Sequence, residues 1–200
     1  MTKLDLGKKL TFTEHEALVA QGIWYRSQFP DRHKDAAKVL QREKTGWWAA
    51  HDYMSGMIGD RGSLFVLIGQ RGTGKTQLAT CVARLVAFHG EEVVYRRASD
   101  LYSDIKATFG VAEESEREVV RGMTTPRLLV IDEMQDRGGT AWEERILNQI
   151  VDSRYASHKD TILISNDVKE ALVNSLGPSI MSRADEIGGI ISTDWGSFRE

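Results

Sequence analysis

A glycine-rich segment between an apolar run and an amphipathic stretch has the residue types and spacing that bind phosphate. Residues 69–77 read GQRGTGKTQ and fit G-x-x-x-x-G-K-[ST]. Glycines let successive backbone N–H groups turn into one concavity, and the following helix directs its positive end there. We expect Lys75 at the β and γ phosphates and the Thr76 hydroxyl on Mg²⁺. The residues predicted to contact a nucleoside triphosphate are Gly69, Gln70, Arg71, Gly72, Thr73, Gly74, Lys75, Thr76 and Gln77.

Two acids and one amide follow other apolar runs and extend this chemistry. Asp132 and Glu133 come directly after residues 128–131, four apolar residues typical of a strand buried on both faces. One carboxylate, Asp132, can hold Mg²⁺, and the second, Glu133, can orient or deprotonate a water. Asn166 follows the run TILIS and can bond the γ-phosphate or that water. The alternatives are a helix-capping acid and a turn asparagine.

Two arginines near the C-terminal end have spacings that leave their roles open. Arg183 lies in IMSRADE and can project toward a nucleotide on another subunit. Arg199 lies in GSFRE and can fold back on the nucleotide of its own subunit. Either can instead form an ordinary surface ion pair.

Apolar strands alternate with helical patterns along the chain, which predicts an α/β fold with a mainly parallel sheet. The candidates Lys75, Asp132, Glu133 and Asn166 then each follow a strand at its C-terminal end, where open α/β sheets bind ligands. Strands are predicted at 64–68, 91–98, 128–131, 161–165 and 190–192, the last after a turn at Gly188-Gly189. Helices are predicted over 36–58 (with an interruption near Thr45-Gly46), over 74–89, after a cap at Ser99-Asp100, over 113–121 and 140–155, after Asp167, and after Pro178.

The first residues are predicted to form an arm, residues 1–21, ahead of one domain spanning 22–200. Thr13 with Glu16 resembles a capping box that opens a short helix; the alternative is a frayed terminus. Trp24, Tyr25 and Phe29 follow as an aromatic cluster. Such a cluster can cover a nucleotide base or serve as a hydrophobic latch.

Composition narrows the class of protein. The chain has 200 residues, 41% of them hydrophobic. Its formal net charge of −3 argues against a uniformly basic nucleic-acid binder but permits a local basic stripe. Cys81 is the single cysteine, so we expect a reducing, cytoplasmic environment. No apolar run reaches membrane-spanning length, and we expect no membrane partner.

The order of these motifs resembles that of AAA+ ATPases. GQRGTGKT, LLVIDE, Ser165-Asn166, Ser182-Arg183 and a terminal G-x-S-x-R follow one another as in that class. The chain is most similar to the DnaC/IstB branch, the replicative helicase loaders and transposase-helper ATPases. GIWYR, SDLYSDIKATF and DSRY add to this resemblance, which covers residues 22–199.

The resemblance implies an AAA+ P-loop NTPase with a five-stranded, mainly parallel sheet flanked by helices. The sequence departs from the family in one respect: it stops one residue after Arg199, so we expect a reduced or absent C-terminal lid. It implies ATP and Mg²⁺ as cofactors, bound through Lys75, Thr76 and Asp132. It also implies roles for four further residues: catalytic base for Glu133, first sensor for Asn166, trans-acting arginine finger for Arg183 and second sensor for Arg199. Single-stranded DNA contacts are implied at Arg96, Arg97, Ser99, Lys106 and Thr108.

Two aromatic side chains of that DNA-binding segment, Tyr102 and Phe109, can stack on bases or bury their own helix, and core packing is the favoured interpretation. The functional hypothesis is an oligomeric, DNA-stimulated ATPase that acts with a replicative helicase in a bacterial or phage-infected cell. The alternatives are a transposition helper that binds duplex DNA and a transposase, a P-loop kinase, and a nucleotide-gated scaffold.

Overall fold

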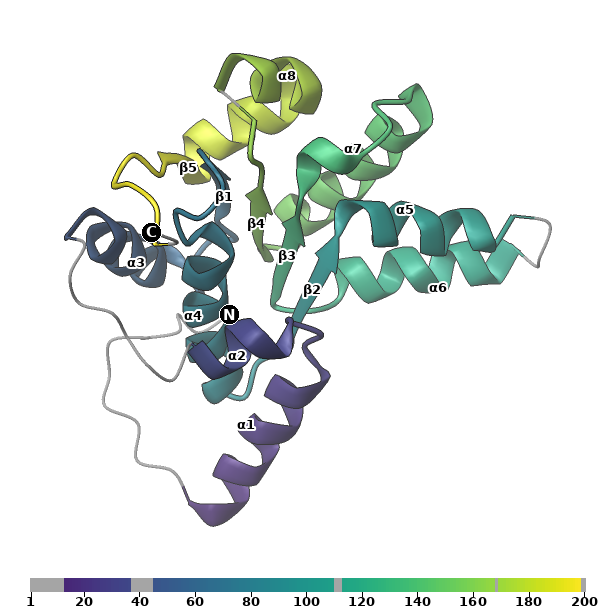
Figure 1. The fold of residues 1–200 in the computed structure, drawn as a ribbon. Helices are drawn as coiled ribbons and strands as arrows, with labels where there is room; N and C mark the ends of the chain where they lie inside the picture. The colour runs from purple at the N-terminus through teal and green to yellow at the C-terminus, as the bar shows by residue number, and fades with distance from the viewer. Residues whose placement is uncertain (1–12, 37–44, 110–112, 168, 199–200) are drawn as a thin grey trace.

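A five-stranded parallel sheet forms the centre of the computed structural model, which describes residues 13–36, 45–109, 113–167 and 169–198 (Figure 1). The strand order is β2-β3-β4-β1-β5, and every pairing is parallel. All residues of β1, β3 and β4 are buried, as their continuous apolar runs predict. The strands are β1 Leu64–Ile68, β2 Val93–Arg97, β3 Leu128–Asp132, β4 Asp160–Ile164 and β5 Gly188–Ser192.

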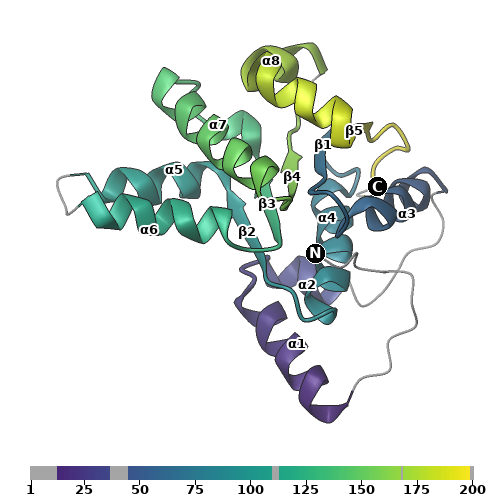
Figure 2. The same ribbon diagram turned by 180° about the vertical axis from the view of Figure 1, so that it is seen from behind.

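Helices cover both faces of the sheet, and the sheet divides the hydrophobic core into two clusters. Alternate strand residues such as Phe65 and Leu67 pack against α1, α3 and α4, while Leu64 and Val66 pack against α5 to α8. Figures 1 and 2 show α5 and α6 side by side, projecting away from the sheet. The helices are α1 Glu14–Arg26, α2 Asp31–Ala36, α3 Thr45–Met57, α4 Lys75–Phe88, α5 Ala98–Ala107, α6 Glu113–Thr124, α7 Ala141–Ala156 and α8 Lys169–Ile187, with a 3₁₀ turn η1 Met134–Asp136.

The predicted capping boxes at Thr13 and Thr140 are confirmed. Each threonine side chain accepts from the backbone N–H three residues on, and that residue, Glu16 or Glu143, bonds back to the cap. The division predicted after residue 21 falls inside α1. This helix is continuous from Glu14 to Arg26 and contacts α4 and β2.

The aromatic cluster after α1 packs into the core. Trp24 stacks on Phe29 with ring centroids 5.5 Å apart, and Phe29 lies 4.9 Å from the ring of Tyr95 on β2. Both Trp24 and Phe29 are buried, whereas Tyr25 is 76% exposed. This arrangement supports the latch rather than a cover for a nucleotide base.

Two local predictions are wrong. The helix predicted to begin after a cap at Ser99-Asp100 begins at Ala98, with Arg97 as N-cap and no capping side chain, because the fully buried Ala98 already packs in the core. Gly188-Gly189, predicted as a turn, opens β5. A Cβ on Gly188 would lie 2.0 Å from the Leu64 carbonyl oxygen, so glycine serves close strand pairing there.

The prediction that Pro178 is an early residue of a short helix is confirmed. Gly177, with φ +78° and ψ 162°, interrupts α8, and Pro178 is the first residue of its second part. No helix follows β5 within the described residues 188–198. Within the described part of the chain, no helix is long and apolar enough to span a bilayer.

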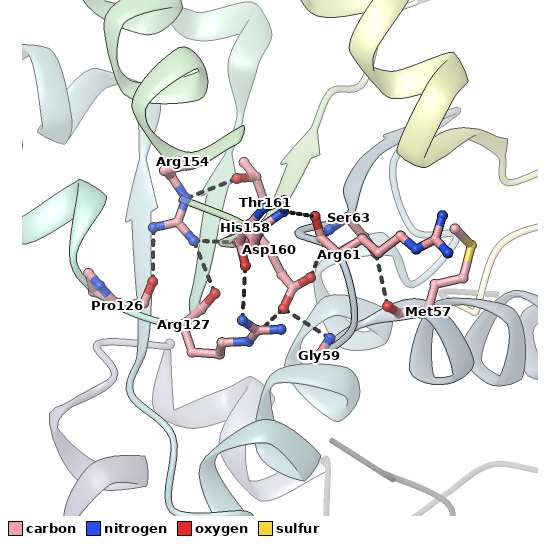
Figure 3. Close-up of polar contacts among 10 residues, drawn as sticks. All are labelled: Met57, Gly59, Arg61, Ser63, Pro126, Arg127, Arg154, His158, Asp160 and Thr161. Atoms are coloured by element: carbon pink, nitrogen blue, oxygen red, sulfur yellow. Dashed lines mark hydrogen bonds and ion pairs between the residues drawn. The ribbon is translucent and has the colours of Figure 1, made fainter. Parts of the chain in front are cut away.

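Two buried arginines and one buried aspartate join the N-terminal ends of β3 and β4 (Figure 3). Asp160 pairs with Arg127 at 3.1 Å and accepts from the backbone N–H groups of Gly59 at 3.1 Å and Ser63 at 2.8 Å. Burial lowers the pKa of Arg154 to about 9, so it stays protonated at neutral pH. Its guanidinium donates to the Thr161 hydroxyl and to the main-chain carbonyls of Met123, Pro126, Arg127 and Asp160.

Candidate nucleotide-binding site

The glycine-rich loop lies at the C-terminal end of β1 and leads directly into α4. Its glycines adopt left-handed backbone, with φ +135° at Gly69 and +81° at Gly74. A Cβ on Gly69 would also lie 2.3 Å from the Thr193 hydroxyl, so close packing requires glycine there as well. The ammonium of Lys75 donates to the carbonyls of Gly69 at 2.6 Å and Gln70 at 2.8 Å. This places the Lys75 charge within the loop, on the residues where phosphate binding is predicted.

Asp132 lies beside the first turn of α4, because β3 and the loop after β1 end at the same edge of the sheet. The Thr76 hydroxyl donates to Asp132 Oδ2 at 2.7 Å, so the two predicted metal ligands lie together. The Tyr95 hydroxyl donates to the same oxygen at 3.0 Å, and the backbone N–H of Glu133 donates to Oδ1 at 2.7 Å. Burial, and then the Asp132 charge, raise the pKa of Tyr95, which keeps its hydroxyl a donor.

Glu133 is held differently from Asp132. Its backbone is left-handed, with φ +56° and ψ 45°, an unfavourable conformation for a residue with a side chain. Its carboxylate is partly exposed and lies 3.4 Å from Arg97 Nε. Arg97 pairs in register with Asp132 across β2 and β3, which brings the Arg97 side chain to the sheet edge where Glu133 lies. The Glu133 charge raises the pKa of Arg97.

Asn166 lines a cavity of about 430 Å³ beside the phosphate loop. Its backbone N–H donates to Gln135 Oε1 at 3.0 Å, which links the end of β4 to the turn after Glu133. Sequence reasoning missed Gln135, although its place two residues after Glu133 could have drawn attention to it. The cavity is lined by Ile68, Gly69, Gln70, Thr73, Asn166, Asp167, Ser192, Thr193, Asp194 and Gly196.

Arg183 lies on α8 and binds side chains of its own subunit. Its guanidinium is 3.0 Å from an Asp152 carboxylate oxygen, donates to the Ser179 hydroxyl, and lies 5.3 Å from the Tyr155 ring centroid. None of these partners belongs to the phosphate loop. Arg199 lies outside the described residues.

The residues expected to contact DNA are distributed around α5 and engage neighbouring side chains. Arg96 lies 3.8 Å from Asp104, and Lys106 lies 3.4 Å from Glu143 and 5.3 Å from the Trp142 ring centroid. Ser99 donates to Asp100, and Thr108 bonds the Ile105 carbonyl at the end of α5. Tyr102 is buried in the core, as favoured, whereas Phe109 is 55% exposed and its ring packs edge-on against Trp142.

The oxygens at this sheet edge suit Mg²⁺ with a bound triphosphate. Magnesium prefers hard oxygen ligands, commonly one hydroxyl or carboxylate from the protein together with phosphate oxygens and waters. The Thr76 hydroxyl and the Asp132 carboxylate form such a set, 2.7 Å apart, beside the Lys75 ammonium. The residues therefore fit the nucleotide–metal group that the motif implies.

A phosphate loop after β1, paired acids after β3 and an amide after the intervening β4 define an AAA+ member of the P-loop nucleotide-binding proteins. Comparison with known proteins gives the family. The family model described as IstB-like ATP binding protein matches residues 56–184, more than half of the chain. The chain therefore belongs to this ATP-binding family.

Individual relatives agree with this assignment. The chain is 31% identical over 193 residues to the replicative helicase loader DnaC of Escherichia coli K12, covering 93% of this chain and 78% of that protein. It is 31% identical over 139 residues to DnaC of Buchnera aphidicola subsp. Schizaphis graminum, covering 68% of this chain and 56% of that relative. The crystal structure of the DnaC helicase loader has a similar fold, with a TM-score of 0.69 at 17% identity over 82% of this chain and 99% of that one.

Proposed function

We propose that the protein is a DNA-stimulated ATPase that acts in DNA replication as a helicase-loader-like factor, its partner being a replicative helicase. The observation that carries the hydrolytic part is the pair at the end of β3. Asp132 is buried and accepts from Thr76, while Glu133 is half-exposed and next to it. One carboxylate is thus suited to Mg²⁺ and the other to a water.

In this proposal each residue has one task. Lys75 and the loop N–H groups hold the β and γ phosphates, Thr76 and Asp132 hold Mg²⁺, and Glu133 accepts a proton from the attacking water. Mg²⁺ held by these two residues would supply positive charge that stabilises the phosphates as the bond breaks. Asn166, on the strand between the loop and the acids, orients that water or the γ-phosphate.

Arginine supplied by a neighbouring subunit completes the proposed site. Arg183 pairs with Asp152 and lies over the Tyr155 ring, both on α7 and neither in the phosphate loop, which supports a role toward another subunit rather than toward its own nucleotide. Arg199 is proposed as the second sensor. Hydrolysis should then depend on self-assembly, and single-stranded DNA bound along Arg96, Arg97, Ser99, Lys106 and Thr108 should promote that assembly.

A transposition helper is the second candidate, because the matching family model is described as IstB-like and the DnaC/IstB branch that the chain resembles includes transposase-helper ATPases. Similarity to DnaC over 93% of the chain supports the loader instead. Comparing stimulation by single-stranded and duplex DNA separates the two.

The test is the ATPase rate per subunit measured against protein concentration, with and without single-stranded DNA. We expect the rate to rise with both, and Glu133→Gln to reduce it by roughly 100-fold or more while ATP still binds. A rate that is flat in concentration, indifferent to DNA and unchanged in Glu133→Gln would refute the proposal. Transfer of phosphate to a small acceptor would indicate a kinase, and full biological activity of Glu133→Gln would indicate a nucleotide-gated scaffold.

A further inference from the structure

The outer side of the phosphate loop carries three successive carbonyls, those of residues 72–74, that accept hydrogen bonds from distant parts of the chain. The donors are, in order, the backbone N–H of Phe198 at 2.8 Å, the indole N–H of Trp195 at 2.8 Å and the indole N–H of Trp47 at 3.3 Å. We call these three donors the outer brace. Two come from the segment after β5 and one from α3.

Close packing accompanies these bonds. A Cβ on Gly74 would lie 3.0 Å from the Phe198 ring and 3.2 Å from Trp47 Nε1, so both aromatics lie directly against the loop. A Cβ on Gly46 would lie 3.1 Å from the Trp195 ring, which places Trp195 between α3 and the loop. The brace is therefore a packed layer and not a set of isolated contacts.

A phosphate nest has an outward side as well as an inward one. When successive N–H groups turn toward an anion, the carbonyls of the same peptides face away and need partners of their own. The Thr73 hydroxyl adds a bond at 2.6 Å to Thr193, also in the segment after β5. Because these partners lie outside the loop, they hold its peptides without occupying the space for phosphate.

We infer that Trp195 and Trp47 are positioning residues for the nucleotide phosphates: they fix residues 72–74 in the conformation that directs the loop N–H groups inward. Their indoles bond the backs of the peptides whose N–H groups the motif assigns to phosphate. A loop that reaches this conformation only part of the time binds nucleotide more weakly in proportion. The inference depends on nucleotide binding alone and not on hydrolysis, DNA or a helicase.

The test substitutions are Trp195→Phe and Trp47→Phe, which keep an aromatic ring and remove the indole N–H. Dissociation constants for ATP and ADP are measured by competition with a fluorescent nucleotide, and melting temperatures are measured without nucleotide. We expect each substitution to raise both dissociation constants by roughly 3- to 10-fold, the equivalent of one lost hydrogen bond. ATP and ADP should be affected alike, because the loop holds phosphates that both carry.

Trp142→Phe is the matched control, since Trp142 lies on α7 against Phe109 and Tyr102. It should leave both dissociation constants unchanged. Nucleotide affinities within twofold of wild type in both brace variants, with a lowered melting temperature, would show a purely structural role and overturn the inference. If one brace variant fails to fold, the other decides the question. Absence of nucleotide binding by the wild-type chain would instead count against the binding site itself.

Discussion

Replacing Asp160 by asparagine removes one charge from the buried network of Arg127, Arg154 and Asp160 at the N-terminal ends of β3 and β4, and it changes the side-chain shape very little. In the native protein Oδ1 accepts from the N–H of Ser63, while Oδ2 accepts from the N–H of Gly59 and faces Arg127 Nε (Figure 3). An asparagine amide can accept on one side only. In either orientation its NH₂ group would face a donor, and Arg127 and Arg154 would lose their buried counter-ion.

Burial determines how much free energy of unfolding the Asp160→Asn substitution removes. Asp160 is fully buried and Arg127 is 3% exposed, so water cannot replace the lost partner. Breaking a buried ion pair by removing one member costs about 3–5 kcal/mol, since the remaining charge stays unpaired. For a domain of this length, that loss lowers the melting temperature by roughly 10 °C.

Thermal unfolding monitored by circular dichroism measures this effect. Asp152→Asn is the matched control, because Asp152 pairs with Arg183 at a similar distance of 3.0 Å but is half exposed. We expect a change of less than about 1 kcal/mol in the control. Equal and small shifts in the two variants would refute the reasoning. ATP affinity should be unchanged in Asp160→Asn below its melting temperature, since Asp160 begins β4 at the opposite end from the phosphate loop.

Three further predictions concern the nucleotide site. Lys75→Ala should weaken ATP binding by roughly 10- to 100-fold, as expected for lost charge-assisted bonds, and fluorescent-nucleotide titration measures this; wild-type affinity would contradict it. Arg97→Ala should raise the ATPase rate measured without DNA by up to about 5-fold, because the Glu133 carboxylate loses its ion-pair partner 3.4 Å away and is then free to accept a proton from water. A fall in that rate would show that Arg97 supports hydrolysis instead. An equimolar mixture of Arg183→Ala and Glu133→Gln proteins should regain roughly a quarter of the wild-type rate, since random assembly joins an intact Glu133 to a neighbour's intact Arg183 at a quarter of the sites. A mixture as inactive as each variant would argue against an arginine acting between subunits.

Much of the fold could be predicted from sequence because its signals are local. Apolar runs such as 128–131 and the motif over 69–77 each fix a strand, a turn or a helix start within about ten residues. The wrong assignment of Ser99-Asp100 shows the limit: a good capping residue is used as a cap only where packing lets the helix begin after it, and Ala98 is already buried in α5.

The outer brace and the buried network could not be predicted in this way. Trp195 lies 122 residues from Thr73, and Asp160 lies 101 residues from Gly59, so neither contact leaves a periodic or spaced pattern. The sequence likewise indicates Tyr95 only as part of a strand. Its hydrogen bond to Asp132 depends on the side-by-side pairing of β2 and β3, which follows from the strand order.

The DSRY segment, residues 152–155 on α7, contacts both the buried network and Arg183. Asp152 and Tyr155 are three residues apart on α7 and therefore share a face, which contacts Arg183 of α8. Arg154 points elsewhere, into the buried network, where its guanidinium bonds five oxygens. These bonds tie α7 to the N-terminal ends of β3 and β4, and together with the buried apolar residues of α7 they help to hold its orientation. Arg154, at the N-terminal ends of the strands, thus contributes to the placement of the α7 face that holds Arg183.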